Sequence, residues 1–353
     1  MSKGTVFVGL SGGVDSSVSA LRLLKAGYDV VGVFMMTWLP EFLDCDIEAE
    51  RLDAMRVAAT LGIPFRTFDA VEAYREGVAN YMIREYEAGR TPNPDVMCNR
   101  RVKFGAFFEY AMGEGADYVA TGHYARVVKR DSYELHRGKD TEKDQSYFLW
   151  TLTERELART LFPVGGSEKR VVRADAARYS LPTAGKRDSQ GICFLGQVDI
   201  REFLSHYVPV RPGDVLNERG TVIGRHDGAL FYTIGQRTGF TVRTAGREER
   251  AHYVVEKNME RNTLTVSDRP RPVSGDRIAL SDVNVIGGVL PERAFAEFRY
   301  RQRPFPVSLE EAAGDHAMLS VTEAGIDLPS PGQSCVLYDG TRCLGGGIID
   351  RIV

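Results

Sequence analysis

The first half of the chain alternates short apolar runs with longer segments of helical periodicity. The apolar runs predict buried strands at Thr5–Leu10, Val30–Met35, Phe65–Phe68 and Tyr118–Thr121. Apolar residues at helical spacing predict helices at Ser16–Ala26 and Glu48–Leu61, from about Arg101, and at Glu154–Leu161 and Arg170–Tyr179. This rhythm of strand, loop and helix favours a parallel sheet with helices on both faces and a ligand site at the carboxyl ends of the strands.

The pattern changes after about Tyr207, where turns rich in proline and glycine separate short strand-like runs. The central runs are Ala229–Ile234 and Tyr253–Glu256. Beyond a cluster of prolines at Arg269–Gly275, further strands are expected at Arg277–Leu280, Ala294–Tyr300, Ala317–Val321 and Ser334–Tyr338. We therefore expect an α/β domain over residues 1–205, a central β-rich module over residues 206–272 and a C-terminal antiparallel β-barrel over residues 273–353.

Composition and charge narrow the class of protein. The 353 residues include 45 Lys and Arg against 48 Asp and Glu, a net charge of -3, which excludes a uniformly basic nucleic-acid coat but allows a local basic patch. The longest apolar runs are too short to span a membrane, and the N-terminus lacks the features of a secretion signal. The 5 cysteines include no CxxC spacing, which argues against a structural zinc site. An odd, scattered set of cysteines fits a reducing, cytoplasmic environment.

The segment Ser11–Ser17 (SGGVDSS) follows the first strand and opens the first helix. Its glycines let backbone N–H groups turn inward, and the helix N-terminus adds a positive dipole end, so the loop is suited to hold an anion. It has neither the GK[ST] of a Walker loop nor the GxGxxG of a dinucleotide fold. The alternative is a plain turn between strand and helix, capped by serine and aspartate.

In this context SGGVDS resembles the PP-loop ATP pyrophosphatases, which cleave ATP between its α and β phosphates. The resemblance implies an adenine nucleotide α-hydrolase-like domain in which Asp15 lies near the phosphates and positions Mg²⁺ or activates the attacking group. It also implies that Met35 lines the adenine pocket, although a methionine at a strand end also suits a core. The implied ATP contacts are Gly9, Leu10, Ser11, Gly12, Gly13, Val14, Asp15, Ser16, Met35 and Gly122.

Two of the cysteines lie in loops rich in proline or glycine, where catalytic groups concentrate. Cys98 follows Thr91–Met97 (TPNPDVM) and precedes a basic stretch (NRRVK) and the expected helix start. Cys193 lies in Asp188–Gly196 (DSQGICFLG), directly after a lysine and an arginine. Nearby cations and a helix N-terminus favour the thiolate form of a cysteine, so both are candidate nucleophiles. Two inert, buried thiols are the alternative.

Seven further motifs extend the resemblance almost to the C-terminus. They are NPDVMCNRRVKFG, ATGHYAR, KDQSYFLW, DSQGICFLG, FYTIGQR, PGQS and CLGGGII. Together with SGGVDS they resemble the tRNA-specific 2-thiouridylases, the MnmA/TrmU family. The resemblance implies an enzyme that replaces the C2 oxygen of the wobble uridine in a tRNA anticodon by sulfur. That oxygen is first adenylated by ATP with release of pyrophosphate, and AMP then leaves.

The same resemblance implies catalytic roles for Cys98, Cys193 and Asp15. Cys193 receives sulfur as a persulfide, from a sulfur-carrier protein or a cysteine desulfurase. Cys98 either attacks the persulfide, leaving a disulfide with Cys193, or assists the attack directly. No metal is expected beyond the Mg²⁺ that ATP carries. The implied contacts with the target base and the tRNA are Asn93, Pro94, Asp95, His123, Lys143, Asp144, Gln145, Arg299, Tyr300 and Gln333.

Simpler interpretations exist for several of these positions and for the whole chain. His123 could be a hydrogen-bonded core histidine, Lys143–Gln145 a solvated face, and the alternating arginines of Arg299–Arg303 the outer face of a strand. Another PP-loop ligase acting on a small acid, or an RNA-binding protein that keeps the nucleotide fold as a scaffold, would also contain the first motif. Neither explains the two cysteine contexts. Thr238–Thr244, in the central module, departs from the glycine-rich stretch usual in the family, whereas the tRNA-contacting domain is expected to be the C-terminal barrel.

Overall fold

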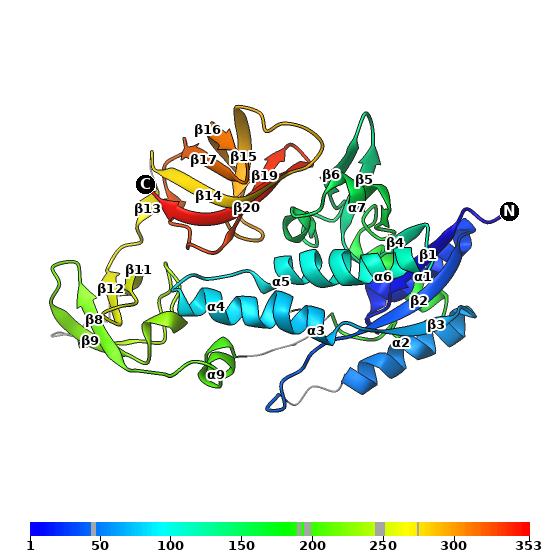
Figure 1. Ribbon diagram of the computed structural model, residues 1–353, viewed down its shortest axis with the longest axis horizontal. Coiled ribbons are helices and arrows are strands. Elements are labelled where there is room, and N and C mark those ends of the chain that lie inside the picture. Colours follow the sequence, from blue (N-terminus) through cyan, green and yellow to red (C-terminus); the bar gives the residue numbers. More distant parts are fainter. Residues whose placement is uncertain (44–46, 189–190, 192, 194–198, 244–250, 274) are drawn as a thin grey trace.

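The computed structural model describes residues 1–43, 47–188, 191, 193, 199–243, 251–273 and 275–353. Figure 1 shows an α/β domain beside the N-terminus, a smaller β-rich module and a β-barrel near the C-terminus, with two helical segments running between them. Cys45, Thr244 and much of the Asp188–Gly196 motif lie outside the described residues. Among the helices that are described, none is long and apolar enough to cross a membrane.

The sheet of the α/β domain is parallel, and its strands have the order β3-β2-β1-β4-β7. The strands are β1 (Thr5–Gly9), β2 (Asp29–Met36), β3 (Phe65–Asp69), β4 (Tyr118–Ala120) and β7 (Thr160–Leu161). The strands predicted in the first half of the chain are confirmed. The prediction of a helix at Glu154–Leu161 is wrong at its C-terminal end. The helix α7 covers only Glu154–Ala158, because Thr160 and Leu161 form a strand that pairs with β4.

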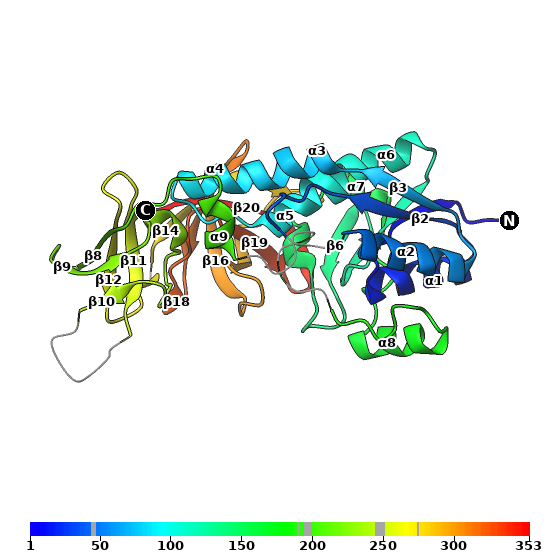
Figure 2. The same cartoon turned by 90° about the horizontal axis from the view of Figure 1, so that it is seen from below.

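Alternating side chains of β1 enter different cores on the two faces of this sheet. Val6 and Val8 pack with α1 (Val14–Ala26) and α2 (Ile47–Leu61), on the face where α8 (Lys169–Arg178) lies against α1 (Figure 2). Phe7 points the other way, into the core formed with the helical segments of residues 71–113. This period of two follows from side chains alternating across a strand. The predicted arrangement of helices on both faces is therefore confirmed.

The two helical segments on the second face run side by side (Figure 1). They consist of α3 (Val71–Tyr74), η1 (Arg75–Asn80) and α4 (Tyr81–Glu87), and of α5 (Pro94–Met97), η2 (Cys98–Ala106) and α6 (Phe107–Gly113). The backbone widens to a π-helix in η1 and η2. The helix expected from about Arg101 starts earlier, because Asn93 caps it by accepting a hydrogen bond from the Val96 amide (3.2 Å) and Pro94 suits its first position.

The central module, entered through α9 (Ile200–Ser205), is a sheet with the strand order β10-β9-β8-β12-β11. Its strands are β8 (Gly213–Asn217), β9 (Val222–His226), β10 (Thr241–Val242), β11 (Tyr253–Asn258) and β12 (Thr263–Ser267). The strand predicted at Ala229–Ile234 is wrong, since Ala229–Phe231 form the 3₁₀ turn η4. The Ala229 amide donates to the Asn262 side chain (3.0 Å), so the apolar run is buried as a turn.

The C-terminal strands close into a barrel of the order β14-β17-β16-β15-β19-β20, with β20 pairing back to β14. The elements here are β13 (Pro272–Val273), β14 (Arg277–Val285), β15 (Arg293–Glu297), β16 (Phe305–Ala313), β17 (His316–Val321), β18 (Ile326–Asp327), β19 (Ser334–Asp339) and β20 (Arg342–Ile352). The predicted antiparallel barrel is confirmed. One prediction is wrong: β15 ends at Glu297, so the arginines of Arg299–Arg303 lie in a turn after the strand, with Arg301 at φ 62°.

A hairpin of the α/β domain that the sequence did not predict joins the barrel. Its strands β5 (Ala125–Lys129) and β6 (Tyr133–Arg137) extend the barrel sheet at β20. At this junction Arg137 donates to Asp144 (3.0 Å) and to Glu297 (2.6 Å), and its guanidinium carbon lies 3.5 Å from the centre of the Tyr338 ring. These contacts fix the α/β domain to the barrel.

Candidate active site

A glycine loop joins the carboxyl end of β1 to α1. Gly12 has φ +68°, and a Cβ at this position would lie 2.6 Å from the Glu50 carbonyl oxygen, so only glycine fits. Gly13 is the N-cap of α1 and gives the helix no side-chain cap. The first turn therefore presents its amide groups, at the positive end of the helix dipole, to an anion.

Serine side chains hold the shape of this loop. Ser16 Oγ accepts a hydrogen bond from the Ser11 amide (3.3 Å) and donates to the Gly13 carbonyl (3.1 Å). Ser17 Oγ donates to the same carbonyl (2.7 Å). Ser16 and Ser17 are buried, whereas Ser11 is exposed. The Ser11 hydroxyl is thus the one among these three that faces solvent beside the loop.

Gly122 and Met35 both lie against this part of the sheet. A Cβ on Gly122 would be 2.8 Å from the Ser16 amide nitrogen and 2.9 Å from the Asp15 carbonyl carbon, so the loop after β4 touches the phosphate loop. Met35 is 4% exposed. A Cβ added to Gly9 would lie 3.0 Å from Met35 Cε, so the two residues are in close contact. Met35 therefore packs in the core directly behind the end of β1.

Asp15 belongs to a network of charged side chains beside the loop. Its carboxylate accepts hydrogen bonds from Lys169 Nζ (2.7 and 2.8 Å) and from the Tyr124 hydroxyl (2.8 Å). Lys169 also pairs with Asp188 (2.9 Å), which binds Lys143 (2.8 Å). Burial alone would raise the pKa of Asp188, but the hydrogen bonds from Lys143 and Lys169 lower it. The network holds several positive charges next to the anion site.

Lys169, Tyr124 and Asp188 were not among the predicted site residues. The sequence does contain one signal for Lys169, because α8 starts with Lys169 and Arg170 and has no acidic residue in its first turn. Cations at a helix N-terminus oppose the helix dipole. Such a start indicates an acidic partner elsewhere in the chain, which the structure identifies as Asp15 and Asp188.

The fold brings Cys98 and Cys193 together. Cys98 opens η2 and is fully buried, and Cys193 is partly buried. The Cys193 amide donates to Asp95 Oδ1 (2.9 Å), and the Tyr74 hydroxyl donates to the Cys193 carbonyl (2.8 Å). Both thiols are free, and each lies close enough to shift the pKa of the other. The predicted pair of cysteines therefore shares one site.

The two sulfur atoms differ in acidity. Burial raises the pKa of Cys98, and the hydrogen bond to Cys193 raises it further. The hydrogen bond from Cys98, together with the charge of Lys103, lowers the pKa of Cys193 against the effect of burial. The expected thiolate character is thus wrong for Cys98, which lies inside a helix that starts at Pro94 and is shielded from water.

The cation beside Cys193 is Lys103 and not the upstream Lys186, which pairs with Asp53 (2.9 Å). Lys103 Nζ lies 3.5 Å from His123 Nε2, and His123 Nδ1 lies 2.7 Å from Thr121 Oγ1. His123 is only 7% exposed, and burial with the nearby positive charge lowers its pKa. The predicted tRNA contact His123 is therefore placed inside the site, next to the cysteine pair.

The loop before Cys98 is held by the barrel. Gln333 Nε2 donates to the Thr91 carbonyl (2.8 Å) and to the Pro92 carbonyl (3.3 Å). The segment Asn93–Asp95 follows directly, with the Asp95 side chain bound to the Cys193 amide. The three residues expected at the target base and the expected tRNA contact Gln333 are therefore grouped around the cysteines.

Arg299 and Tyr300 lie in the turn after β15. The Tyr300 ring packs 4.5 Å from the Phe148 ring, between centroids. The Arg299 side chain is 44% exposed, and its guanidinium lies 3.7 Å from the Asp327 carboxylate. It also approaches the central module, because a Cβ added to Gly235 would lie 3.4 Å from Arg299 Nη2. Arg299 is thus an exposed cation where the barrel meets the central module.

The predicted tRNA contacts Lys143, Asp144 and Gln145 differ in what they touch. Lys143 belongs to the charged network through Asp188. Asp144 is buried and accepts hydrogen bonds from the amides at positions 138 (2.9 Å) and 146 (3.1 Å). Gln145 Oε1 accepts from the Tyr124 amide (3.0 Å). The side chains of Asp144 and Gln145 therefore hold the backbone in place.

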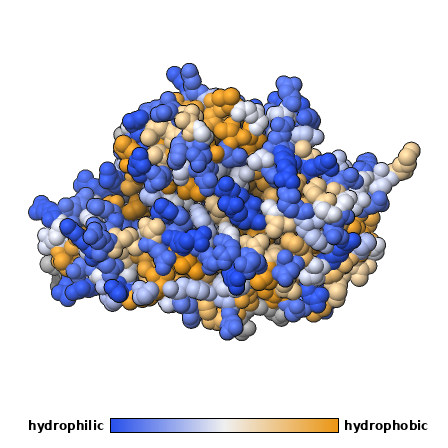
Figure 3. Space-filling view, in the orientation of Figure 1, coloured by the Kyte–Doolittle hydropathy of each residue, from blue (hydrophilic) through white to orange (hydrophobic). Residues whose placement is uncertain are grey.

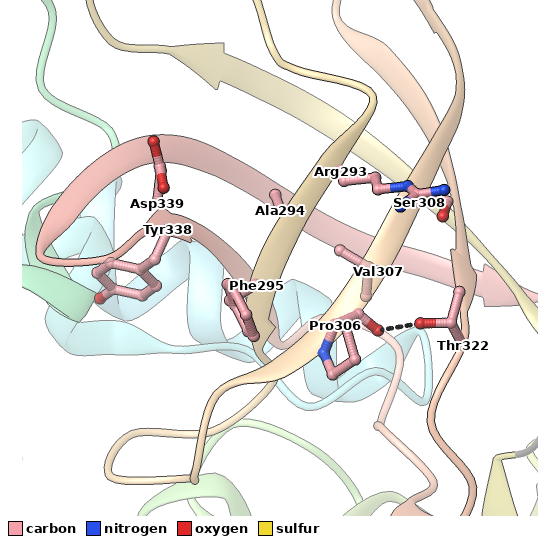
Figure 4. A pocket seen from close by; sticks show the side chains of 9 residues that line it. All are labelled: Arg293, Ala294, Phe295, Pro306, Val307, Ser308, Thr322, Tyr338 and Asp339. Atoms are coloured by element: carbon pink, nitrogen blue, oxygen red, sulfur yellow. Dashed lines mark hydrogen bonds between the residues drawn. The ribbon is translucent and has the colours of Figure 1, made fainter.

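A separate hollow of about 450 Å³ lies on the barrel (Figure 4) and contains none of the predicted site residues. It is lined by Arg293, Ala294, Phe295, Pro306, Val307, Ser308, Thr322, Tyr338 and Asp339. Figure 3 shows a largely hydrophilic face with several apolar patches, one of which lies over the barrel. Cys335 and Cys343 are fully buried in the barrel, and burial raises the pKa of both. Within the described residues, no cluster of three or more His, Cys, Asp or Glu could hold a metal.

Comparisons with known proteins cover nearly the whole chain. Residues 4–197 match the tRNA methyl transferase HUP domain family, residues 201–268 the tRNA methyl transferase PRC-barrel domain and residues 276–349 the aminomethyltransferase beta-barrel domain. The chain is 45% identical to the tRNA-specific 2-thiouridylase MnmA of Enterococcus faecalis, over 99% of this chain and 96% of the relative. It is also 45% identical to the MnmA of Geobacillus thermodenitrificans, over 98% and 95%.

Solved structures of lower similarity match little more than half of the chain. A 4-thiouridine synthetase in complex with RNA and ATP is 18% identical, with a TM-score of 0.35 over 58% of this chain and 50% of that chain. The U34-tRNA thiolase NcsA from Methanococcus maripaludis is 16% identical, with a TM-score of 0.36 over 58% and 63%. The full-length identity to the curated relatives decides the assignment: this chain belongs to the tRNA-specific 2-thiouridylase (MnmA) family.

Proposed function

We propose that the chain thiolates C2 of the wobble uridine in a tRNA anticodon, in an ATP-dependent reaction carried by a persulfide on Cys193. The observation that supports this most is the turn Gly122-His123-Tyr124. Its first and last residues touch the phosphate loop, and its middle residue contacts Lys103 beside Cys193. A nucleotide on the loop and a sulfur nucleophile can therefore reach the same base.

The first step activates the base. The C2 oxygen of uracil is a poor leaving group, and attack of this oxygen on the α-phosphorus of ATP converts it to an ester that leaves as AMP. The loop amides around Gly12 and Gly13 are positioned for the departing pyrophosphate, and Ser11 adds an exposed hydroxyl. Lys169, held by Asp15, supplies a fixed positive charge at the same place.

Mg²⁺ fits this site as an ion carried by ATP. Magnesium is usually held by substrate phosphates, several waters and one or two carboxylates. Asp15 is the carboxylate of the loop, and both of its oxygens accept hydrogen bonds from Lys169. Asp15 would share the ion after exchanging one of these bonds, and the ion would neutralise phosphate charge. The charged side chains of the chain itself orient the nucleotide around that ion.

The second step delivers sulfur from the persulfide of Cys193. Two routes conserve both atoms and electrons. In one, the terminal sulfur of the persulfide attacks C2 and AMP leaves, and the Cys98 thiol then gives up its proton as its sulfur attacks Cys193 Sγ and releases the thiocarbonyl. In the other, Cys98 first attacks Cys193 Sγ and releases hydrosulfide, which attacks C2. Both routes end in a Cys98–Cys193 disulfide, so the next turnover needs a two-electron reductant. Both routes require the two sulfur atoms to meet, and the mutual effect of the two cysteines on their pKa values supports this proximity.

The target base must leave the anticodon stack to reach this buried pair, and loop bases can be splayed out easily. We place it beside Asn93, Pro94 and Asp95, which adjoin the cysteines. Exposed Arg299 and its neighbour Tyr300 are positioned for phosphate contact and stacking. Among residues 143–145, we assign the tRNA contact to Lys143. The side chains of Asp144 and Gln145 already accept hydrogen bonds from backbone amides of the protein.

The sulfur donor is expected to be a persulfide-bearing carrier protein or desulfurase, since the thiolate of Cys193 can accept a sulfane sulfur by exchange. Such a relay and the reduction of the final disulfide require a reducing compartment that contains tRNA, which is the cytoplasm.

The test combines the full chain with ATP, Mg²⁺, unmodified tRNA and a persulfide donor, followed by nucleoside mass analysis. We expect 2-thiouridine from the native chain, none from Cys193→Ser, and tRNA binding nearly intact in that variant. Cys343→Ala, which alters a buried barrel cysteine outside the site, is the matched control and keeps activity. Thiolation by Cys193→Ser would contradict the mechanism, and no 2-thiouridine from the native chain with an active donor would contradict the function.

A further inference from the structure

Lys103 and Cys98 lie on the same π-helical segment, η2. In an α-helix, residues five apart differ by roughly 140° around the axis, so their side chains diverge. In a π-helix the backbone hydrogen bond joins residues i and i+5, which lie one wider turn apart. The π-helical turn therefore brings Lys103 to the face of Cys98, where its positive charge also acts on the Cys193 sulfur.

His123 fixes the direction of the Lys103 ammonium. An ammonium can only donate hydrogen bonds, so His123 Nε2, 3.5 Å from Lys103 Nζ, must be the acceptor. Nδ1 then carries the proton and donates to Thr121 Oγ1 (2.7 Å). The neutral ring that this arrangement requires agrees with the lowered pKa of His123.

We propose that Lys103 is a further catalytic residue of the sulfur-transfer reaction, whose ammonium holds negative charge on the Cys193 sulfur, and that His123 positions Lys103. This inference rests on the proposed function. It gives His123 a role inside the protein, acting on sulfur through a lysine. The proposal also explains the π-helical turn of η2, because in an α-helix the side chain of Lys103 would point away from Cys98.

The positive charge of Lys103 acts in the step that loads sulfur onto Cys193. The Cys193 thiolate attacks the terminal sulfur of the donor persulfide, forming the new S–S bond. The donor's S–S bond breaks, and its electron pair leaves on the donor thiolate. The cation is needed before this attack, when the anion is on Cys193. Cys98 is not the attacking group, because burial holds its own thiol protonated.

The titratable groups that face Cys193 in the described structure come from both helical segments. They are Cys98 and Lys103 from η2, Asp95 from α5 and Tyr74 from α3. Of these, only Lys103 is a cation. Burial would lower the pKa of Lys103, but the attraction of Cys193 and Cys98 raises it, so the lysine stays charged at neutral pH. Removing it leaves the sulfur anion facing only neutral and acidic groups.

The experiment measures the rate at which iodoacetamide alkylates Cys193 between pH 5 and 10, with each cysteine followed by peptide mass. Lys103→Met removes the charge while keeping most of the volume, and we expect a midpoint at least one pH unit higher and an alkylation rate about tenfold lower at pH 7. Lys103→Arg keeps the charge and should retain the low midpoint. The matched control is Lys129→Met, an exposed lysine on β5, which should behave as the native chain.

The readout needs no ATP, tRNA or sulfur donor, so it is independent of the proposed function. A midpoint shift in Lys103→Met supports the role of Lys103 even where no 2-thiouridine forms. An unshifted midpoint overturns the inference even where native thiolation is normal, and so does a raised midpoint in Lys103→Arg. If Lys103→Met does not give a cooperative thermal transition, Lys103→Gln replaces it with the same expected shift. His123→Asn should raise the midpoint by a smaller amount than Lys103→Met.

Discussion

At the scale of single residues, the surroundings of each cysteine decide its chemistry. Cys335 and Cys343 are fully buried, and burial raises the pKa of both. Cys193 meets a thiol donor and an ammonium, which lower its pKa despite burial. The sequence contexts predicted Cys98 and Cys193 as a pair, and the structure places them in one site. The contexts could not show which one is the thiolate, because the deciding cation is Lys103, positioned by a π-helical turn that has no signature in the sequence.

Asp188 gives a stability prediction with a definite sign. Its pKa is lowered in the folded chain by Lys143 and Lys169, so its contribution is complete above the unfolded value of about 3.9 and is lost as the pH falls below that value. We expect Asp188→Asn to reduce the free energy of unfolding by about 2 kcal/mol at pH 7. Urea unfolding at pH 7 and pH 3 measures this. The difference from the native chain should shrink at pH 3, and Asp131→Asn, at an exposed position, should show no difference at either pH.

At the scale of elements, hydrophobic periodicity predicted the parallel strands β1 to β4 and several of the helices, but not β7 or the helical segment of residues 71–87. It failed where local hydrogen bonding outweighed the apolar pattern. The run Ala229–Ile234 is bound by Asn262 as a turn, and the helix thought to begin near Arg101 is started earlier by the Asn93 cap. The hairpin β5–β6 was missed because its partner, β20, lies at the other end of the sequence. Long-range pairing of this kind leaves no local pattern.

Close packing of the loop after β4 against the phosphate loop gives a prediction about ATP. In Gly122→Ala the new Cβ would be 2.8 Å from the Ser16 amide nitrogen, so the phosphate loop must shift. We expect kcat/KM for ATP to fall by about tenfold to a hundredfold. Initial-rate measurements of pyrophosphate release in the presence of tRNA would show this.

Gly113→Ala is the control for this change, since a Cβ at the end of α6 meets nothing within 4 Å. It should leave kcat/KM for ATP unchanged. Equal kinetics in Gly122→Ala and Gly113→Ala would show that the two loops do not form one nucleotide site.

At the scale of the whole molecule, the α/β domain and the barrel share a sheet, and Gln333 of the barrel binds the loop before Asn93. The three-part organisation was predicted from the change of pattern along the chain, and the boundaries at residues 205 and 272 stay predictions. The acidic net charge of -3 is compatible with tRNA binding, because exposed cations such as Arg299 and Lys143 can act locally. What the sequence could not predict is that part of the site is held by the barrel.

The Arg137 junction predicts how firmly the two parts are joined. Arg137→Leu leaves the carboxylates of Asp144 and Glu297 buried without their partner, so we expect a loss of about 3–5 kcal/mol in the free energy of unfolding. Differential scanning calorimetry of the full chain would detect it as a lower midpoint. Arg351→Leu breaks an exposed pair with Asp350 and should change little. A midpoint in Arg137→Leu equal to that of the control would show that this junction contributes nothing to stability.

In the mechanism proposed here, one site couples cleavage of ATP between its α and β phosphates to sulfur insertion in tRNA. The most direct test follows ATP labelled at the α-phosphate during a single turnover of the persulfide-loaded chain with tRNA, and measures AMP, ADP and 2-thiouridine together. We expect AMP and 2-thiouridine in equal amounts, no ADP, and neither product with a tRNA that carries cytidine at the wobble position. Formation of ADP, or of 2-thiouridine without AMP, would contradict it.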